Sequence, residues 1–311
     1  MCNVSTKNIT KNIIKRPEKI NYNRMKTSTL LLTFIFMMNI VYAQEKILLY
    51  PDGAAESNGI TEEEQFLRKD FMVKISEPRM YVYPAPAEVN TGTAVLICPG
   101  GGYTGVSVIK EGEEIAQWFN KLGITAFVLY YRMPNGHHEI PLKDAKTALE
   151  IIHKRAKEWK IDKTKIGIMG FSAGGHLAST AGTHLTAKNS RPDFMILAYP
   201  VISMQPEITH RGSKQNLIGK TPDEGLVKLY SNELQVTTKT PPTFLFHAED
   251  DKSVPIQNTY LFAEALKLKK VPVEVYTFPE GGHGIGMRPT NPEADKWPVM
   301  LENWMKKQKL I

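Results

Sequence analysis

The segment KIGIMGFSAGGHL, residues 165–177, contains the most informative short-range pattern of the sequence. Residues 165–169 are an apolar run typical of a short, buried β-strand, and a helical pattern follows over residues 174–185. Between them stands Gly-Phe-Ser-Ala-Gly, whose glycines permit a tight turn that holds Ser172 in a strained backbone conformation. A strand, a sharp turn and a helix in this order match a nucleophile elbow, which predicts Ser172 as a nucleophile. The alternative is a glycine-rich turn that only starts a helix.

Outward from this segment, short apolar runs alternate with helical patterns, and the sequence contains no repeats. Strands are expected at 46–50, 80–83, 94–98, 126–131, 165–169, 194–199, 243–247 and 273–278, and helices at 111–122, 142–159, 174–185, 257–268 and 292–307. This alternation predicts an α/β fold with a mostly parallel central sheet and helices on both faces. The first two strands have no helix between them, so we expect an antiparallel edge.

Residues 200–242 interrupt the alternation. They are rich in Thr, Ser, Gly, Lys and Pro and have weak apolar periodicity. A long irregular insertion in a compact domain is usually functional. We expect this lid-like insertion to lie over the carboxyl ends of the strands, where open α/β sheets bind their ligands.

A nucleophilic serine needs a base, and the base needs an acid that orients it. After a nucleophile elbow the acid comes first in the chain and the histidine second. The last predicted strand is followed by Gly-Gly-His-Gly, and its His283 is the only histidine after His247. The strand before it is followed by three carboxylates, Glu249, Asp250 and Asp251. Their position alone leaves open which of the three is the acid.

A second glycine-rich stretch, Cys-Pro-Gly-Gly-Gly-Tyr at 98–103, follows the strand at 94–98. Its three glycines let backbone N–H groups turn toward a developing oxyanion without side chains in the way. Phosphate binding is disfavoured because no Gly-Lys-Ser/Thr follows. Tyr103, at the end of this stretch, is expected either to bound an acyl pocket or to pack in the interior.

Together these motifs resemble the α/β-hydrolase superfamily, and within it the acetyl esterase/lipase branch that includes secreted carbohydrate and xylan acetyl esterases. The resemblance runs from about residue 81 to residue 310. It implies Ser172 as nucleophile, His283 as base and Asp251 as acid. Asp251 is preferred because the family's acid stands three residues before the Val of a Val-Pro pair, here Val254.

The resemblance also implies oxyanion donors from Gly101, Gly102 and the N–H of Ala173. Relatives of the hormone-sensitive-lipase type carry a histidine where this chain has Pro99 and an acidic residue where it has Phe171. These departures argue against a lipid or bulky acyl group and favour the carbohydrate-esterase branch.

The resemblance therefore implies a secreted serine carboxylic ester hydrolase that removes O-acetyl groups from hemicellulose-type polysaccharides or oligosaccharides. Its partner would be an acylated carbohydrate, with no metal, no organic cofactor and no nucleic acid. Three alternatives are a feruloyl or other short-acyl esterase, a serine peptidase of the prolyl-oligopeptidase type, and a non-catalytic binding protein. Such peptidases usually carry a large propeller domain, for which the residues before Ser172 are too few.

The other histidines are expected to have simpler roles. His247 and His210 are candidates to line the substrate pocket, whereas His176 is expected to pack in the core. His137 and His138 lie in a polar loop, and no accompanying carboxylate or cysteine pattern suggests a metal site there.

Residues 1–43 account for most of the net charge of +7, since they hold seven basic side chains and one acidic one. A charged start, a short apolar run and Val-Tyr-Ala before residue 44 are typical of a secretory signal peptide cleaved after Ala43. A membrane anchor is the alternative, and translation from Met25 would shorten the leader. We expect a secreted or periplasmic domain over residues 44–311, without stable membrane insertion. Its single cysteine, Cys98, excludes an internal disulfide.

Overall fold

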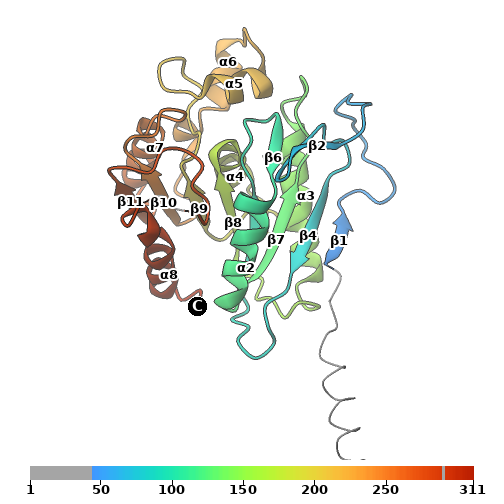
Figure 1. The fold of residues 1–311 in the computed structure, drawn as a ribbon, viewed down its shortest axis with the longest axis vertical. Helices are drawn as coiled ribbons and strands as arrows, with labels where there is room; N and C mark the ends of the chain where they lie inside the picture. The colour runs from blue at the N-terminus through green and yellow to red at the C-terminus, as the bar shows by residue number, and fades with distance from the viewer. Residues whose placement is uncertain (1–43, 289–290) are drawn as a thin grey trace, which may run out of the picture. The chain divides into compact units, whose positions relative to one another are not determined.

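The computed structural model describes residues 44–288 and 291–311, so the predicted signal peptide lies outside the described residues. An eight-stranded sheet has the order β1-β4-β7-β5-β8-β9-β10-β11 (Figure 1). From β7 to β11 all neighbours are parallel, whereas β1 pairs antiparallel with β4, and β4 with β7, which confirms the expected edge. The strands are β1 Glu45–Leu48, β4 Arg79–Tyr83, β5 Ala94–Cys98, β7 Thr125–Tyr130, β8 Ile166–Phe171, β9 Met195–Ala198, β10 Thr243–Ala248 and β11 Val273–Phe278.

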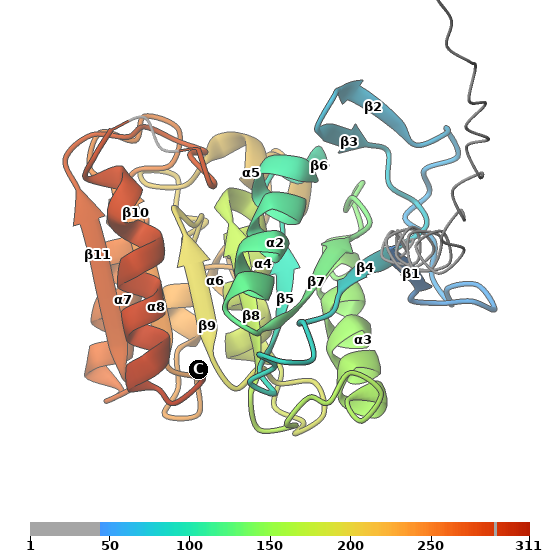
Figure 2. The same cartoon turned by 60° about the horizontal axis from the view of Figure 1, so that its bottom comes forward.

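Helices cover both faces of this sheet. Helices α2 (Glu114–Lys121) and α8 (Trp297–Lys307) pack on one face, and Figure 2 shows them in front of the strands. Helices α3 (Ile140–Arg155), α4 (Ser172–His184) and α7 (Gln257–Leu268) contribute to the core on the other face. Because both faces are covered, central strands such as β5 and β8 are buried along their whole length, which explains their continuous apolar sequence. The predicted fold class is confirmed.

A second sheet of three antiparallel strands was not anticipated. It has the order β2-β3-β6 and consists of β2 Gln65–Arg68, β3 Phe71–Val73 and β6 Gly105–Ser107. All four residues of β2 are exposed, and β3 and β6 have three residues each, so none of them produces an apolar period in the sequence. Figure 2 shows β2 and β3 standing apart from the main sheet.

The insertion is more ordered than expected. It contains α5 (Arg211–Ile218), α6 (Glu224–Leu229) and the 3₁₀ turn η2 (Asn232–Gln235). Helices α5 and α6 are short and polar, and a side chain caps the N-terminus of each, His210 for α5 and Asp223 for α6. His210 accepts a hydrogen bond from the Ser213 N–H, which caps α5. Figure 1 shows α5 and α6 beyond one end of the main sheet.

Two further helical segments differ from the expectation at their first turn. The predicted helix at 111–122 is a π-helical turn, η1 (Ile109–Glu113), followed by α2. The predicted helix at 292–307 is the 3₁₀ turn η3 (Ala294–Lys296) followed by α8. Across the described ranges, no helix is both long enough and apolar enough to cross a membrane.

Candidate active site

Ser172 lies at the turn between β8 and α4, as predicted. Its φ of 53° is in the left-handed region, which is strained for a residue with a side chain. The turn is possible because its neighbours lack side chains: a Cβ on Gly170 would lie 2.1 Å from the carbonyl oxygen of Gly174. A Cβ on Gly174 would lie 2.1 Å from the carbonyl oxygen of Cys98, on the adjacent strand β5. Glycine is therefore required where helix α4 starts close against the sheet.

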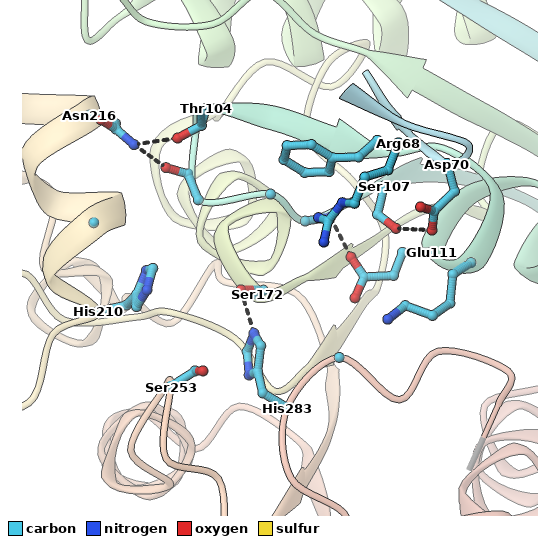
Figure 3. A pocket seen from close by; sticks show the side chains of 17 residues that line it. Arg68, Asp70, Thr104, Ser107, Glu111, Ser172, His210, Asn216, Ser253 and His283 are labelled. Carbon is cyan, nitrogen blue, oxygen red and sulfur yellow. Dashed lines mark hydrogen bonds between the residues drawn. The ribbon is translucent and has the colours of Figure 1, made fainter. Parts of the chain in front are cut away.

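His283 and Asp251 join Ser172 in one hydrogen-bonded chain. His283 Nε2 lies 2.9 Å from Ser172 Oγ (Figure 3). On the other side of the ring, His283 Nδ1 lies 2.6 Å from Asp251 Oδ2. Because the carboxylate only accepts, Nδ1 carries the proton and Nε2 is free to accept from the serine hydroxyl. The structure thus brings together the three residues named from the sequence, in the order that a serine nucleophile requires.

Asp251 is held in its charged form. Burial alone would raise its pKa, but hydrogen bonds from His247 and His283 and from the Val254 N–H outweigh that effect and hold the pKa well below its usual range. His247 Nε2 lies 3.0 Å from Asp251 Oδ2, and its Nδ1 lies 2.8 Å from Thr259 Oγ1. His247 is therefore behind the acid and fully buried, so its prediction as a pocket-lining residue was wrong.

The neighbouring carboxylates have other contacts. Asp250 Oδ1 accepts hydrogen bonds from the N–H groups of Gly281 and Gly282, at 3.0 and 2.8 Å. It therefore fixes the loop that presents His283. Glu249 contacts Thr277 at an exposed position. The different contacts therefore distinguish the three acidic residues, whose positions in the sequence alone did not show which one is the acid.

The glycine loop after β5 lies next to the serine. Gly101 and Gly102 line the same cavity as Ser172 and have φ values of 149° and 64°. Within the described residues, the N–H groups of Gly101, Gly102 and Ala173 have no hydrogen-bond acceptor. Ala173 is in the first turn of α4, where helix N–H groups lack intrahelical partners. The arrangement fits an oxyanion site, whose role stays a prediction.

Glu111 is a site residue that sequence reasoning missed. It lies in the π-helical turn η1, is 5% exposed and lines the cavity. One carboxylate oxygen accepts the Gly100 N–H at 2.8 Å, and the other accepts the Tyr199 hydroxyl at 2.8 Å. The Tyr199 ring meets the His283 ring edge-on at a centroid distance of 4.9 Å. Glu111 thereby connects the glycine loop to the histidine, a contact that no sequence motif signals.

Tyr103 does not bound the pocket. It is 3% exposed, and its hydroxyl lies 2.9 Å from Nδ1 of His176. Tyr103 therefore packs in the interior, the second of its two expected roles, and His176 packs in the core as expected. Burial lowers the pKa of His176 to about 4, which keeps this core histidine neutral. Of the two histidines expected to line the substrate pocket, His247 and His210, only His210 lines the cavity.

The cavity around Ser172 has a volume of about 770 Å³. Most of the lining residues are polar. Besides the elbow, the glycine loop and the loop with His283, the wall is formed by the three-stranded sheet, η1 and the start of α5. The lining side chains outside the predicted set are Arg68, Asp70, Phe71, Thr104, Ser107, Lys110, Glu111, Asn216 and Ser253. None of these residues belongs to a recognisable sequence motif. The folding of the second sheet and of the insertion brings them together around Ser172.

The histidine pair in the polar loop has a structural contact: His138 Nδ1 lies 2.7 Å from the Tyr230 hydroxyl. Over residues 44–288 and 291–311, no group of three or more His, Cys, Asp or Glu side chains is arranged to hold a metal ion.

The sheet order, the elbow and the Ser–His–Asp contacts define an α/β-hydrolase fold in which a serine, a histidine and an aspartate form one hydrogen-bonded chain. Comparison with known proteins agrees with this class. The family model described as BD-FAE matches residues 80–266, and the chain belongs to that family.

Three similar proteins illustrate the relationship. An acetylxylan esterase of Xylanibacter ruminicola is 38% identical over 70% of this chain and 46% of its own length. An endo-1,4-β-xylanase B of Butyrivibrio fibrisolvens is 38% identical over 67% of this chain and 34% of its own length. The crystal structure of an acetyl ester-xyloside bifunctional hydrolase from Caldicellulosiruptor lactoaceticus has a TM-score of 0.74 and 37% identity, and covers 88% of this chain and 99% of that one. The chain thus spans less than half the length of the first two relatives.

Proposed function

We propose that this protein is a carboxylic ester hydrolase that removes O-acetyl groups from xylan-type oligosaccharides or polysaccharides. The observation that supports this most is the hydrogen-bonded chain from Ser172 through His283 to Asp251, at the edge of a polar cavity. The names of the similar acetylxylan esterase and of the acetyl ester-xyloside hydrolase support the substrate class.

The reaction follows from this geometry in two steps. Ser172 Oγ attacks the ester carbonyl while His283 Nε2 takes its proton, and Asp251 stabilises the resulting imidazolium. The N–H groups of Gly101, Gly102 and Ala173 hold the oxyanion of the tetrahedral intermediate. His283 then gives its proton to the sugar oxygen, which leaves as an alcohol and an acetyl group remains on the serine.

Water completes the cycle. His283 takes a proton from a water molecule, which attacks the acetyl-serine carbonyl, and the same oxyanion donors hold the second intermediate. The proton returns to Ser172 Oγ as acetate leaves. The pKa of Asp251 is held low, so the carboxylate stays charged at neutral pH.

The cavity favours a small acyl group and a hydroxyl-rich alcohol. Its lining contains four charged side chains and one aromatic ring, Phe71, and lacks the broad apolar wall that a long acyl chain would need.

We further propose that residues 1–43 direct secretion and are removed after Ala43. N-terminal sequencing of the exported protein would test this, with Gln44 as the expected first residue.

The test of the proposed function is acetate release from acetylated xylo-oligosaccharides by the purified protein, with feruloyl esters and peptides in parallel. We expect acetate release that is lost in Ser172→Ala and retained in Ser57→Ala, a control at an exposed serine. Hydrolysis of feruloyl esters or peptides without acetate release would refute the proposed substrate. Acetate release that survives in Ser172→Ala would refute the mechanism.

A further inference from the structure

We propose that the cavity-facing side of the three-stranded sheet, formed by Arg68, Asp70 and Ser107 around Phe71, binds the sugar that carries the ester. This inference rests on the proposed function and adds to it a division of the cavity. The sugar occupies the wall formed by the second sheet, and the acyl group occupies the wall formed by the start of α5.

The register of the sheet places these residues on one face. Arg68 of β2 pairs with Phe71 of β3, and Phe71 pairs with Ser107 of β6. Side chains directly opposite each other across antiparallel strands lie on the same face, and successive residues alternate. Arg68, Phe71 and Ser107 therefore form a row on one face of the sheet, and all three line the cavity with Ser172. The next residue, Met72, faces the opposite way and is buried in the core.

This wall is fixed relative to the serine. Strand β6 follows the glycine loop after two residues, and the Val108 N–H donates to the Asp70 carbonyl oxygen at 2.8 Å. The Phe71 ring packs directly on the glycine loop, where a Cβ on Gly101 would lie 2.9 Å from its Cε2 atom. A ligand held by the row is thus held at a defined position beside the predicted oxyanion donors.

The polar groups of this wall are available. The Arg68 guanidinium lies over the Phe71 ring, 5.1 Å from its centroid, and has no carboxylate within 4.0 Å in the part of the chain that the structure describes. Asp70 accepts one side-chain hydrogen bond, from Ser107 Oγ at 3.3 Å. A planar set of N–H donors beside a carboxylate complements neighbouring sugar hydroxyls, each of which both donates and accepts.

On the opposite wall, several polar atoms are already used in hydrogen bonds within the protein. Figure 3 shows His210 and Asn216 on one side of Ser172 and Arg68 and Asp70 on the other. The Asn216 amide nitrogen already donates to the Gly102 carbonyl oxygen at 2.7 Å and to Thr104 Oγ1 at 2.8 Å. His210 Nδ1 is 2.8 Å from Ser213 Oγ. The guanidinium of Arg68 and the carboxylate of Asp70 lie on the side of the three-stranded sheet, so the sugar is assigned to that side and the small acyl group to the other.

The experiment compares two substrates that share the acetyl group and differ in the alcohol. The ratio of kcat/KM for an acetylated xylo-oligosaccharide to that for 4-nitrophenyl acetate is measured in the purified protein and in three variants. Arg68→Ala removes the guanidinium of the wall, and Asp70→Asn removes the negative charge of its carboxylate. Lys69→Ala is the matched control, because Lys69 is an exposed residue of the same hairpin that does not line the cavity.

We expect Arg68→Ala and Asp70→Asn each to lower kcat/KM for the oligosaccharide about tenfold, the usual effect of losing one charge-assisted hydrogen bond. This decrease should come mainly from a higher KM for the oligosaccharide. The kcat/KM for 4-nitrophenyl acetate should stay within about twofold of the wild-type value. Equal losses on both substrates, or no loss on either, would overturn the assignment.

A binding measurement separates this proposal from the proposed function. Calorimetric titration of Ser172→Ala with unacetylated xylohexaose should show binding that weakens about tenfold when Arg68→Ala is added. If the wild-type protein cleaves 4-nitrophenyl acetate but no acetylated saccharide, the proposed substrate fails, and the titration still decides the subsite. Absence of xylohexaose binding, or binding unchanged by Arg68→Ala, would overturn it.

Discussion

Replacing Glu111 by Gln tests whether the glycine loop and the base are positioned by one buried carboxylate. Glu111 is 5% exposed and accepts two hydrogen bonds, from the Gly100 N–H and from the Tyr199 hydroxyl, both at 2.8 Å. Glutamine preserves the shape but keeps only one acceptor oxygen, so its NH₂ group faces one of the two donors. One charge-assisted bond is lost, and a buried donor loses its partner.

The loss of this bond should cost about 2 kcal/mol of folding free energy. In a domain of this size that corresponds to a fall in Tm of about 4–8 °C. Activity should fall further, because Gly100 precedes the two proposed oxyanion donors, Gly101 and Gly102. Removing an oxyanion donor outright costs about 10²–10³ in kcat, so displacing the loop that carries two of them should cost about 10–100-fold.

The assay is kcat and KM with 4-nitrophenyl acetate, beside Glu113→Gln, a control in the same turn whose carboxylate accepts a hydrogen bond from the exposed Gln117. Tyr199→Phe removes one of the two contacts and should give a smaller loss of kcat than Glu111→Gln. A kcat for Glu111→Gln within twofold of wild type, despite a lowered Tm, would refute the positioning role and leave Glu111 with a purely structural one.

Three further outcomes follow from the buried charges. Asp251→Asn should lower kcat by about 10³–10⁴ in the ester assay, because a neutral amide, which can also donate to Nδ1, neither fixes the tautomer of His283 nor stabilises its imidazolium. The pKa of Asp251 is depressed in the folded state, so its contribution to stability is present above about pH 4 and is lost as the pH falls below that value. Thermal unfolding from pH 7 to pH 3 should therefore show the Tm difference between wild type and Asp251→Asn shrinking below about pH 4. Asp144→Ala leaves the buried Arg132 without its partner and should lower the free energy of unfolding by about 3–5 kcal/mol in urea titration.

The sequence was informative wherever the function of a residue depends on its neighbours in the chain. The elbow around Ser172, the loop with His283 and the buried strands β5, β7 and β8 all follow from short-range patterns of glycine and apolar residues. The same patterns predict the parallel sheet and place the serine at its carboxyl end.

Residues whose roles depend on tertiary contacts could not be found in this way. His247 adjoins the acidic cluster in sequence, yet its side chain points into the interior and supports Asp251 from behind. Glu111 belongs to a helical pattern that gives no sign of a π-helical turn or of contact with Gly100. The three-stranded sheet was missed because its strands are short and β2 is exposed on both faces.

A serine-directed fluorophosphonate tests whether Ser172 is the nucleophile that removes acetyl groups. The protein is labelled to completion, acetate release from acetylated xylo-oligosaccharides is followed in parallel, and the modified residue is located by peptide mass spectrometry. We expect one label per chain, on Ser172, with acetate release falling in proportion to labelling. A label on another residue, or full acetate release from fully labelled protein, would contradict it.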